Sequence, residues 1–218
     1  MPGRLPGTFS YVQATRLVTQ PTTAVFGGRL HIAVNSSTSP YYGDPSAGSE
    51  IRVLYSPNGG KSWVGPASVA PSTSREPQHV HPSIDIGGFG SKAYVGYYVQ
   101  QADERLRTDI ATVEPDGKKL EVQRDRLSSV AFDLTPSNII RTVSPRATTN
   151  YDRLIASCYN IGEYMSVNAP TFWGSDDRVT AAWGDNRRTW TGPAGPPPSS
   201  APYTHAQPDV FFGHAGGD

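Results

Sequence analysis

The stretch over residues 56–63, Ser-Pro-Asn-Gly-Gly-Lys-Ser-Trp, constrains the fold of this chain more than any other. Residues 51–55 before it alternate apolar and polar side chains, as a half-buried strand does. The Asn58-Gly59-Gly60 run tolerates the positive φ angles that a tight hairpin turn requires. The hydroxyls of Ser56 and Ser62 can bond local backbone groups. The stretch therefore predicts a hairpin turn that is followed by Trp63, a large ring expected to be buried.

A four-stranded pattern recurs along the chain, with a period of about 50–60 residues. Helical periodicity is absent, so the repeats predict an all-β fold of about three four-stranded units. The expected units are residues 22–70, 82–128 and 162–216, with a long connection over 129–161. Residues 7–18 are expected to form an outer strand, which the third unit lacks.

The turn residues resemble the Asp-box of sialidases and other BNR-repeat proteins, Ser-x-Asp-x-Gly-x-Thr-Trp. The matching residues are Ser56, Asn58, Gly60, Ser62 and Trp63, with Asn58 in the place of Asp and Ser62 in the place of Thr. The residues around Trp183 and Asp209 look like the last blade of sialidase-like proteins. The resemblance implies a single sialidase-like β-propeller segment over residues 1–218, as a partial or half ring, in which the box is structural. It also implies either further blades from a longer chain or pairing with a second copy.

Composition excludes several classes of partner. The formal net charge is zero and charged residues make up 17% of the chain, so neither nucleic acid nor a membrane surface is an expected partner. No apolar stretch is long enough to span a bilayer, and the first residues begin no secretory signal. An extracytoplasmic location is implied by the resemblance alone. The single cysteine, Cys158, is expected to be a buried thiol.

The connections between the expected strands differ in length. Those between the first and second strands of a unit, and between the third and fourth, are short. The other connections are long and are predicted to lie together at the opposite end: residues 36–49, 70–81, 100–107, 128–163 and 187–208. Because long loops on a rigid scaffold collect binding residues, we expect a ligand at that end. The family resemblance implies that this ligand is a glycan or a protein.

The family resemblance also implies candidate site residues. Sialidases hold a substrate carboxylate with three arginines and use a Tyr–Glu nucleophile pair with an Asp acid/base. The catalytic candidates are Glu163, Tyr164 and Asp185. The substrate-binding candidates are Arg141, Arg146, Arg153, Arg187, Arg188, Trp190, Tyr203 and His205.

Other features favour a chain without a complete catalytic site. Glu163 and Tyr164 are neighbours, so in one extended strand their side chains point to opposite faces. The Phe/Tyr-Arg-Ile-Pro segment of sialidase domains is absent. Asp185 and Arg187, two residues apart, suit an ion pair that braces the fold. Two hypotheses therefore stay open, a non-catalytic or incomplete binding module and an exo-sialidase-type glycoside hydrolase, and we favour the first.

No metal or cofactor is expected. His79 and His81 have a spacing that a metal site can use, but no third ligand is near in sequence, so a surface loop is the preferred interpretation. Five aromatic residues are expected to pack between strands: Tyr94, Tyr97, Tyr98, Trp173 and Trp183.

Overall fold

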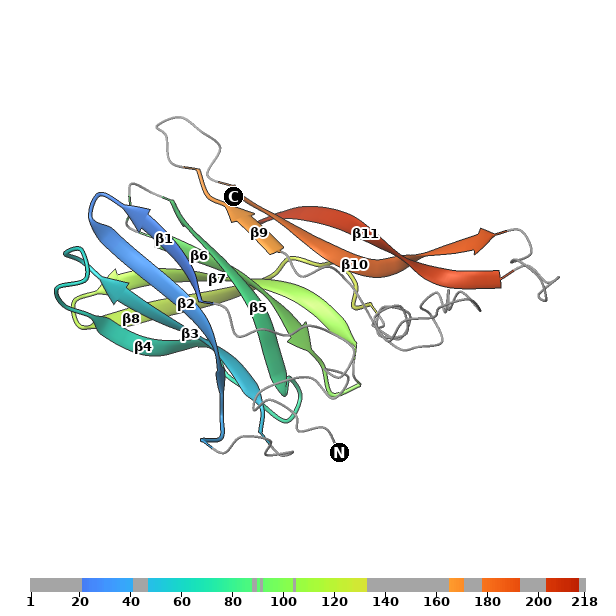
Figure 1. The fold of residues 1–218 in the computed structure, drawn as a ribbon, viewed down its shortest axis with the longest axis horizontal. Coiled ribbons are helices and arrows are strands. Elements are labelled where there is room, and N and C mark those ends of the chain that lie inside the picture. The colour runs from blue at the N-terminus through green and yellow to red at the C-terminus, as the bar shows by residue number, and fades with distance from the viewer. Residues whose placement is uncertain are drawn as a thin grey trace, which may run out of the picture.

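The structure is a computed structural model that describes residues 21–40, 47–87, 90, 92–103, 105–132, 165–170, 178–192 and 203–215. These residues form eleven β-strands in three antiparallel sheets (Figure 1). The all-β class predicted from the sequence is confirmed. Within the described ranges, no helix has the length and apolarity needed to cross a membrane.

Sheet A is a four-stranded meander at the N-terminal side of the described chain. Its strands are β1 (Thr22–Phe26), β2 (Arg29–Ser37), β3 (Ser49–Ser56) and β4 (Val64–Ala70), in that spatial order. Alternation along β3 buries Ile51 and Val53 on the inner face. Gly27 and Gly28, both at positive φ, form the turn between β1 and β2, a conformation that glycine adopts at little cost.

Sheet B repeats this meander. Its strands are β5 (Gln78–Gly87), β6 (Lys92–Gln100), β7 (Leu106–Asp116) and β8 (Lys119–Arg126), in that order. The prediction that residues 78–81 and 106–107 lie in loops is wrong, because β5 and β7 begin earlier than expected. The β5–β6 register shifts between Val80 and Ser83, and His81 has a φ of 53°. Such a bulge admits Pro82, which has no N–H for the ladder.

Sheet C has three strands among the described residues, β9 (Met165–Asn168), β10 (Val179–Gly192) and β11 (Tyr203–Ala215), in the order β11-β10-β9. The hairpin of β10 and β11 runs out beyond the two four-stranded sheets (Figure 1). The prediction of a loop over 187–208 is wrong at both ends, because the ladder resumes after a register shift between Asp185 and Arg188. The outer strand expected at residues 7–18 lies outside the described residues.

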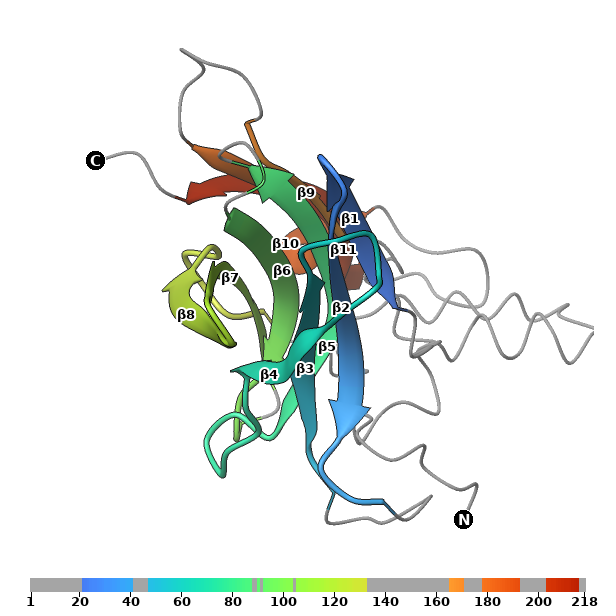
Figure 2. The same ribbon diagram turned by 90° about the vertical axis from the view of Figure 1, so that its left-hand side faces the viewer.

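The three sheets pack face to face, with sheet B in the middle (Figure 2). One apolar core lies between sheets A and B, and a second lies between sheets B and C. The first strands of the sheets lie close together, since β5 contacts both β1 and β9. Gly96 on β6 allows a close approach, because a Cβ there would lie 2.8 Å from Val167 on β9. Strands β5 to β7 of sheet B therefore carry buried residues on both faces, whereas the edge strand β8 is mostly exposed.

Candidate functional site

The long connections meet at one end of the sheet stack, which we call the long-connection end. The N–H of Ser49, after the β2–β3 connection, donates to the Pro77 carbonyl in the β4–β5 connection at 3.0 Å. The N–H of Ala102, in the β6–β7 connection, donates to the Arg75 carbonyl at 2.8 Å. Three connections that are far apart in the sequence are thus joined by backbone hydrogen bonds.

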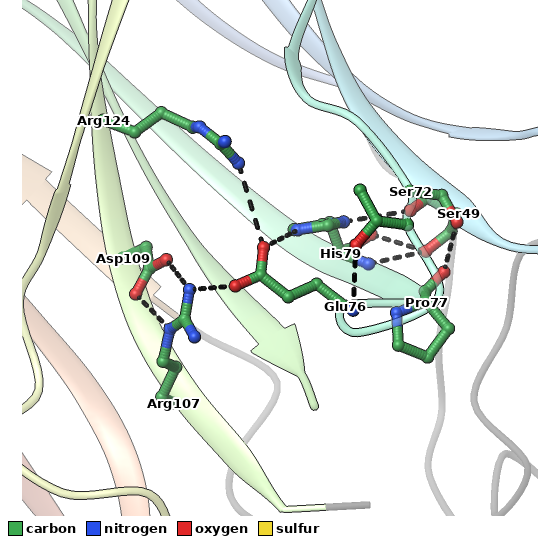
Figure 3. A network of polar contacts seen from close by, with 9 residues as sticks. Ser49, Ser72, Glu76, Pro77, His79, Arg107, Asp109 and Arg124 are labelled. Carbon is green, nitrogen blue, oxygen red and sulfur yellow. Dashed lines mark hydrogen bonds and ion pairs between the residues drawn. The ribbon is translucent and has the colours of Figure 1, made fainter. Parts of the chain in front are cut away.

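A charged network lies at this end, on the face of sheet B that looks toward sheet A (Figure 3). Arg107 on β7 donates to both oxygens of Asp109, from Nε at 2.8 Å and from Nη2 at 2.7 Å. The same Nη2 donates to Oε1 of Glu76, in the β4–β5 connection, at 2.6 Å. A guanidinium that bridges two carboxylates is a strong, charge-assisted arrangement. This arrangement holds the β4–β5 connection against sheet B.

The ionisation of this network follows from its contacts. The hydrogen bond to Asp109 raises the pKa of Arg107 above its usual range and outweighs the opposing effect of burial. Burial raises the pKa of Glu76, but its hydrogen bond to Arg107 and the nearby positive charges together bring the pKa below its usual value. Arg107 and Glu76 are therefore both charged near neutral pH.

His79 lies beneath Glu76 and is fully buried. Its backbone N–H donates to the Ser49 hydroxyl at 3.0 Å, and that hydroxyl donates to the His79 carbonyl at 2.7 Å. Nδ1 lies 3.2 Å from the Ser49 carbonyl, which only accepts, so we assign the ring proton to Nδ1. Burial lowers the pKa of His79, which leaves Nε2 with a free lone pair, 3.7 Å from Oε2 of Glu76.

Tyr97 on β6 lies beside His79 in the same buried region. Its side chain is fully buried, and its hydroxyl has no hydrogen-bond partner among the described residues. The Tyr97 and His79 rings meet edge to face, with centroids 5.8 Å apart. Burial, with the negative charge of Asp109, raises the pKa of the Tyr97 phenol. The phenol is therefore a neutral donor without an acceptor.

Buried polar atoms without a partner are concentrated at the long-connection end. In the described part of the chain they include five atoms at this end, from Gln78, His79, Tyr97, Gln101 and Thr108. The two others are the ring nitrogens of His31, near the opposite end. Since buried polar groups are almost always bonded in folded proteins, this concentration indicates where further hydrogen-bond partners are needed.

Asp185 and Arg187, two predicted site residues, are brought together by the structure. The Asp185 carboxylate is fully buried and accepts from the backbone N–H and the Nε of Arg187, each at 2.7 Å. Arg187 also donates to the Ser129 hydroxyl at 3.1 Å and lies over the Phe211 ring at 4.3 Å. The pair thus braces sheet C, which is the structural alternative considered from the sequence.

The other predicted residues fall into two groups. Arg188, Trp190, Tyr203 and His205 lie on the β10–β11 hairpin, where Trp190 pairs with His205 across the ladder and Gly192 pairs with Tyr203. The remaining candidates lie outside the described residues, as do Cys158 and Trp173: Arg141, Arg146, Arg153, Glu163 and Tyr164.

The box-like turn lies at the opposite end of sheet A, which we call the short-turn end. The Ser56 hydroxyl accepts from the Gly60 N–H at 2.8 Å. Asn58 Oδ1 accepts from the Ser62 N–H at 2.8 Å, and Asn58 Nδ2 donates to the Ser62 hydroxyl at 2.9 Å. The Gly59 N–H donates to the Gly28 carbonyl at 2.7 Å, which joins this turn to the β1–β2 turn.

The expectation that Trp63 is buried is wrong. Its side chain is 43% exposed, although its ring passes 3.7 Å from the Cβ that a substituted Gly60 would carry. Trp63 immediately precedes the edge strand β4, so no further strand of sheet A covers the ring. The turn therefore has the local backbone bond predicted for the Ser56 hydroxyl, without burial of the Trp.

No family model matches the chain, and no curated protein matches it in sequence. Among the described residues, no group of three or more His, Cys, Asp or Glu side chains is placed to hold a metal ion.

Sequence reasoning missed the charged network. The sequence predicts a surface loop for His79 and a loop over 100–107 for Arg107, and both predictions are wrong. The packing predicted for Tyr97 is confirmed, because its side chain belongs to the core between sheets A and B. A signal was present, because Arg107 and Asp109 are two residues apart in the run Arg-Thr-Asp-Ile-Ala, so a strand brings both to one face. No local pattern reveals that Glu76 reaches them from another connection.

Proposed function

We propose that this chain is a sialidase-like propeller module that binds a glycan or protein ligand at its long-connection end and is not a complete hydrolase. The observation that carries this proposal is the concentration of charged and unpartnered polar groups at that end. The short-turn end of sheet A instead carries turns whose polar groups bond one another.

The propeller architecture is supported by the repetition of the sheets. Two four-stranded meanders and a three-stranded sheet pack face to face, as successive blades do. β1, β5 and β9, each the first strand of its sheet, lie together, as the inner strands of blades do. Residues 7–18 are the proposed fourth strand of sheet C.

Exposed apolar side chains on the two outermost sheets support the proposal that further blades or a second copy pack against them. Val25 on β1 is 64% exposed, while Val210 and Phe212 on β11 are exposed to 73% and 72%. Apolar side chains on the two outermost sheets are suited to contact with further blades or with a second copy of the chain. We propose one of these two arrangements for the assembled protein.

The non-catalytic character is supported by the pairing of charges. An arginine that clamps a substrate carboxylate needs free N–H groups in a fork. Arg107 instead bridges Asp109 and Glu76, and Arg187 uses Nε on Asp185. Asp185, the acid/base candidate, accepts hydrogen bonds on both oxygens. These groups hold the fold together and are not free to act on a substrate.

The proposal is tested by blocking each end separately. A cysteine at exposed Ser74, in a Cys158→Ser background, is coupled to a bulky maleimide, and a matched cysteine replaces exposed Lys118 at the β7–β8 turn. Retention on glycan and protein arrays should be lost with the label at residue 74 and kept with the label at residue 118. The reverse pattern, or no retained ligand, contradicts the proposal.

The hydrolase alternative is tested in parallel. We expect no release of sialic acid from an aryl sialoside above background. Turnover by the mass-verified chain that disappears in Tyr164→Phe or Glu163→Gln would establish the alternative and overturn the non-catalytic assignment. Arg146→Lys then distinguishes a bidentate clamp from a general positive field, because lysine keeps the charge without the fork.

A further inference from the structure

Tyr97 and His79 present two unpartnered atoms in one buried region of the long-connection end. Both side chains are fully buried, and neither the Tyr97 hydroxyl nor Nε2 of His79 has a hydrogen-bond partner among the described residues. The two rings meet edge to face, with centroids 5.8 Å apart. The two atoms therefore belong to one buried cluster.

The hydrogen-bonding capacity of this site is mixed. The Tyr97 hydroxyl can donate, whereas Nε2 of His79 accepts, because Nδ1 carries the ring proton toward the Ser49 carbonyl. An alcohol group matches both needs, since it accepts through its oxygen and donates its proton. A carboxylate offers acceptors only, and an ammonium group offers donors only.

The charge around the site is balanced. Glu76 and Asp109 supply two negative charges, and Arg107 and Arg124 supply two positive ones. An anion entering here would approach the Glu76 carboxylate, and a cation would approach the two guanidinium groups. The balance favours a neutral polar ligand over either kind of ion.

The contact between Arg124 and Glu76 lies at the more exposed side of the network (Figure 3). It is the longest ion pair of the network, with 3.9 Å between Nη1 of Arg124 and Oε2 of Glu76. The Arg124 side chain is 43% exposed, whereas the Arg107 side chain is 16% exposed. An exposed, loosely held arginine can move aside at low cost.

Resting on the proposed binding function, we propose that a neutral sugar unit binds between Glu76 and Arg124 and directs one hydroxyl to Tyr97 and His79. Glu76 accepts from a second hydroxyl, and Arg124 donates to the sugar oxygens. The site lies between sheets A and B, and the ligand class is a neutral polyhydroxylated ring.

The test titrates the full chain with methyl β-galactoside and methyl α-mannoside, and with sodium acetate at matched ionic strength. The readout is the ring resonance of His79 in a proton–carbon correlation spectrum, assigned with His79→Gln. A saturable shift with at least one glycoside, at a dissociation constant of about 1 mM or weaker, is expected for a single sugar unit. Acetate should give no saturable shift.

Tyr97→Phe separates a binding role from a structural role. Because the hydroxyl has no hydrogen-bond partner among the residues that the structure describes, removing it should leave the urea unfolding midpoint unchanged or raised. Glycoside affinity should fall about tenfold, the size expected for one lost hydrogen bond. Tyr55→Phe, at the short-turn end, is the matched control and should bind normally. Arg124→Ala should weaken binding severalfold, while Arg29→Ala should not.

Three results overturn the site. These are the absence of a saturable shift with either glycoside, equal affinity in Tyr97→Phe, and a glycoside-soaked crystal with only an ordered water on the Tyr97 hydroxyl. Failure here is distinguishable from failure of the proposed function. The chain would then retain array ligands, lose them with the label at residue 74, and keep the same affinity in Tyr97→Phe. That combination would show that it binds at the long-connection end through other residues.

Discussion

The connections at the two ends of the sheet stack are held in place by different kinds of hydrogen bonding. At the short-turn end, the box turn of sheet A bonds its own polar groups through Ser56, Asn58 and Ser62 over a few residues. At the long-connection end, Glu76 and Arg107 form an ion pair between segments 31 residues apart, and Arg107 also pairs with Asp109. The side-chain bonds of this turn are local, and one backbone bond, from the Gly59 N–H to the Gly28 carbonyl, joins it to the β1–β2 turn. The long-range network couples the connection to the sheet, and it leaves polar groups such as Tyr97 unpartnered.

The largest effect is expected for Arg107→Ala. The change leaves Asp109, which is 5% exposed, without its bidentate partner, and it also releases Glu76. Removing one partner of a buried pair should lower the free energy of unfolding by about 3–5 kcal/mol. Urea unfolding measures this loss of stability. The control is Arg105→Ala, which removes the half-exposed ion pair with Asp103, and no measurable loss of stability is expected for it.

The double variant Arg107→Leu/Asp109→Leu sharpens this result. It removes both charges together, so much of the lost stability should return. A double variant as unstable as Arg107→Ala would show that the network contributes more than the compensation of a buried charge.

A pH effect should arise from His31, which is fully buried in sheet A and stacked on Tyr55 with centroids 4.7 Å apart. Burial lowers the pKa of His31 from 6.5 to about 4. In the window from pH 6.5 to 4 the unfolded chain binds a proton that the folded chain excludes, so stability falls as the pH falls. The loss attributable to His31 is about 3 kcal/mol and is complete near pH 4.

His31→Phe isolates this effect at the short-turn end. Its free energy of unfolding should fall less steeply than that of the wild type across the same window. A residual slope should remain, because burial also lowers the pKa of His79 at the long-connection end. Equal slopes in the two proteins would contradict the assignment of His31 as a neutral buried ring.

The fold could be predicted largely because its signals are local. Gly27-Gly28 and the Asn58-Gly59-Gly60 turn appear in the sequence beside the alternating strands that they join. The strands that begin at Gln78 and Leu106 were missed at their polar ends, where charged and His side chains replace the apolar alternation. There the bulge near Pro82 and the ion pairs sustain the strand, which propensity alone does not show.

The candidate site was less predictable for a related reason. Asp185 and Arg187 are two residues apart, so their pairing could be inferred from spacing. The contact of Glu76 with Arg107 depends on how the β4–β5 connection folds over sheet B, and no sequence interval encodes it. Trp63 shows the same limit at the short-turn end, because its exposure depends on which element lies beside β4.

Trp63→Ala should have an intermediate effect. A fully buried aromatic costs about 3–5 kcal/mol on truncation, but the 43% exposure of Trp63 means that much of its surface is already in water. We expect a loss of about 2 kcal/mol in urea unfolding, from the contact with the box turn. A loss near that of Arg107→Ala would indicate that another part of the chain or a second copy covers the ring in solution.

The smallest effect is expected for Asn58→Ala in the same turn. Asn58 accepts from the Ser62 N–H and donates to the Ser62 hydroxyl, but these bonds are exposed, so water can replace them. The loss should be about 1 kcal/mol, the usual net value of such hydrogen bonds. Asn58→Asp is the matched control and should be near neutral, because the carboxylate still accepts from the Ser62 N–H and the Ser62 hydroxyl can rotate to donate. If Asn58→Ala were as damaging as Arg107→Ala, the short-turn end would depend on long-range contacts, and the contrast between the two ends would be lost.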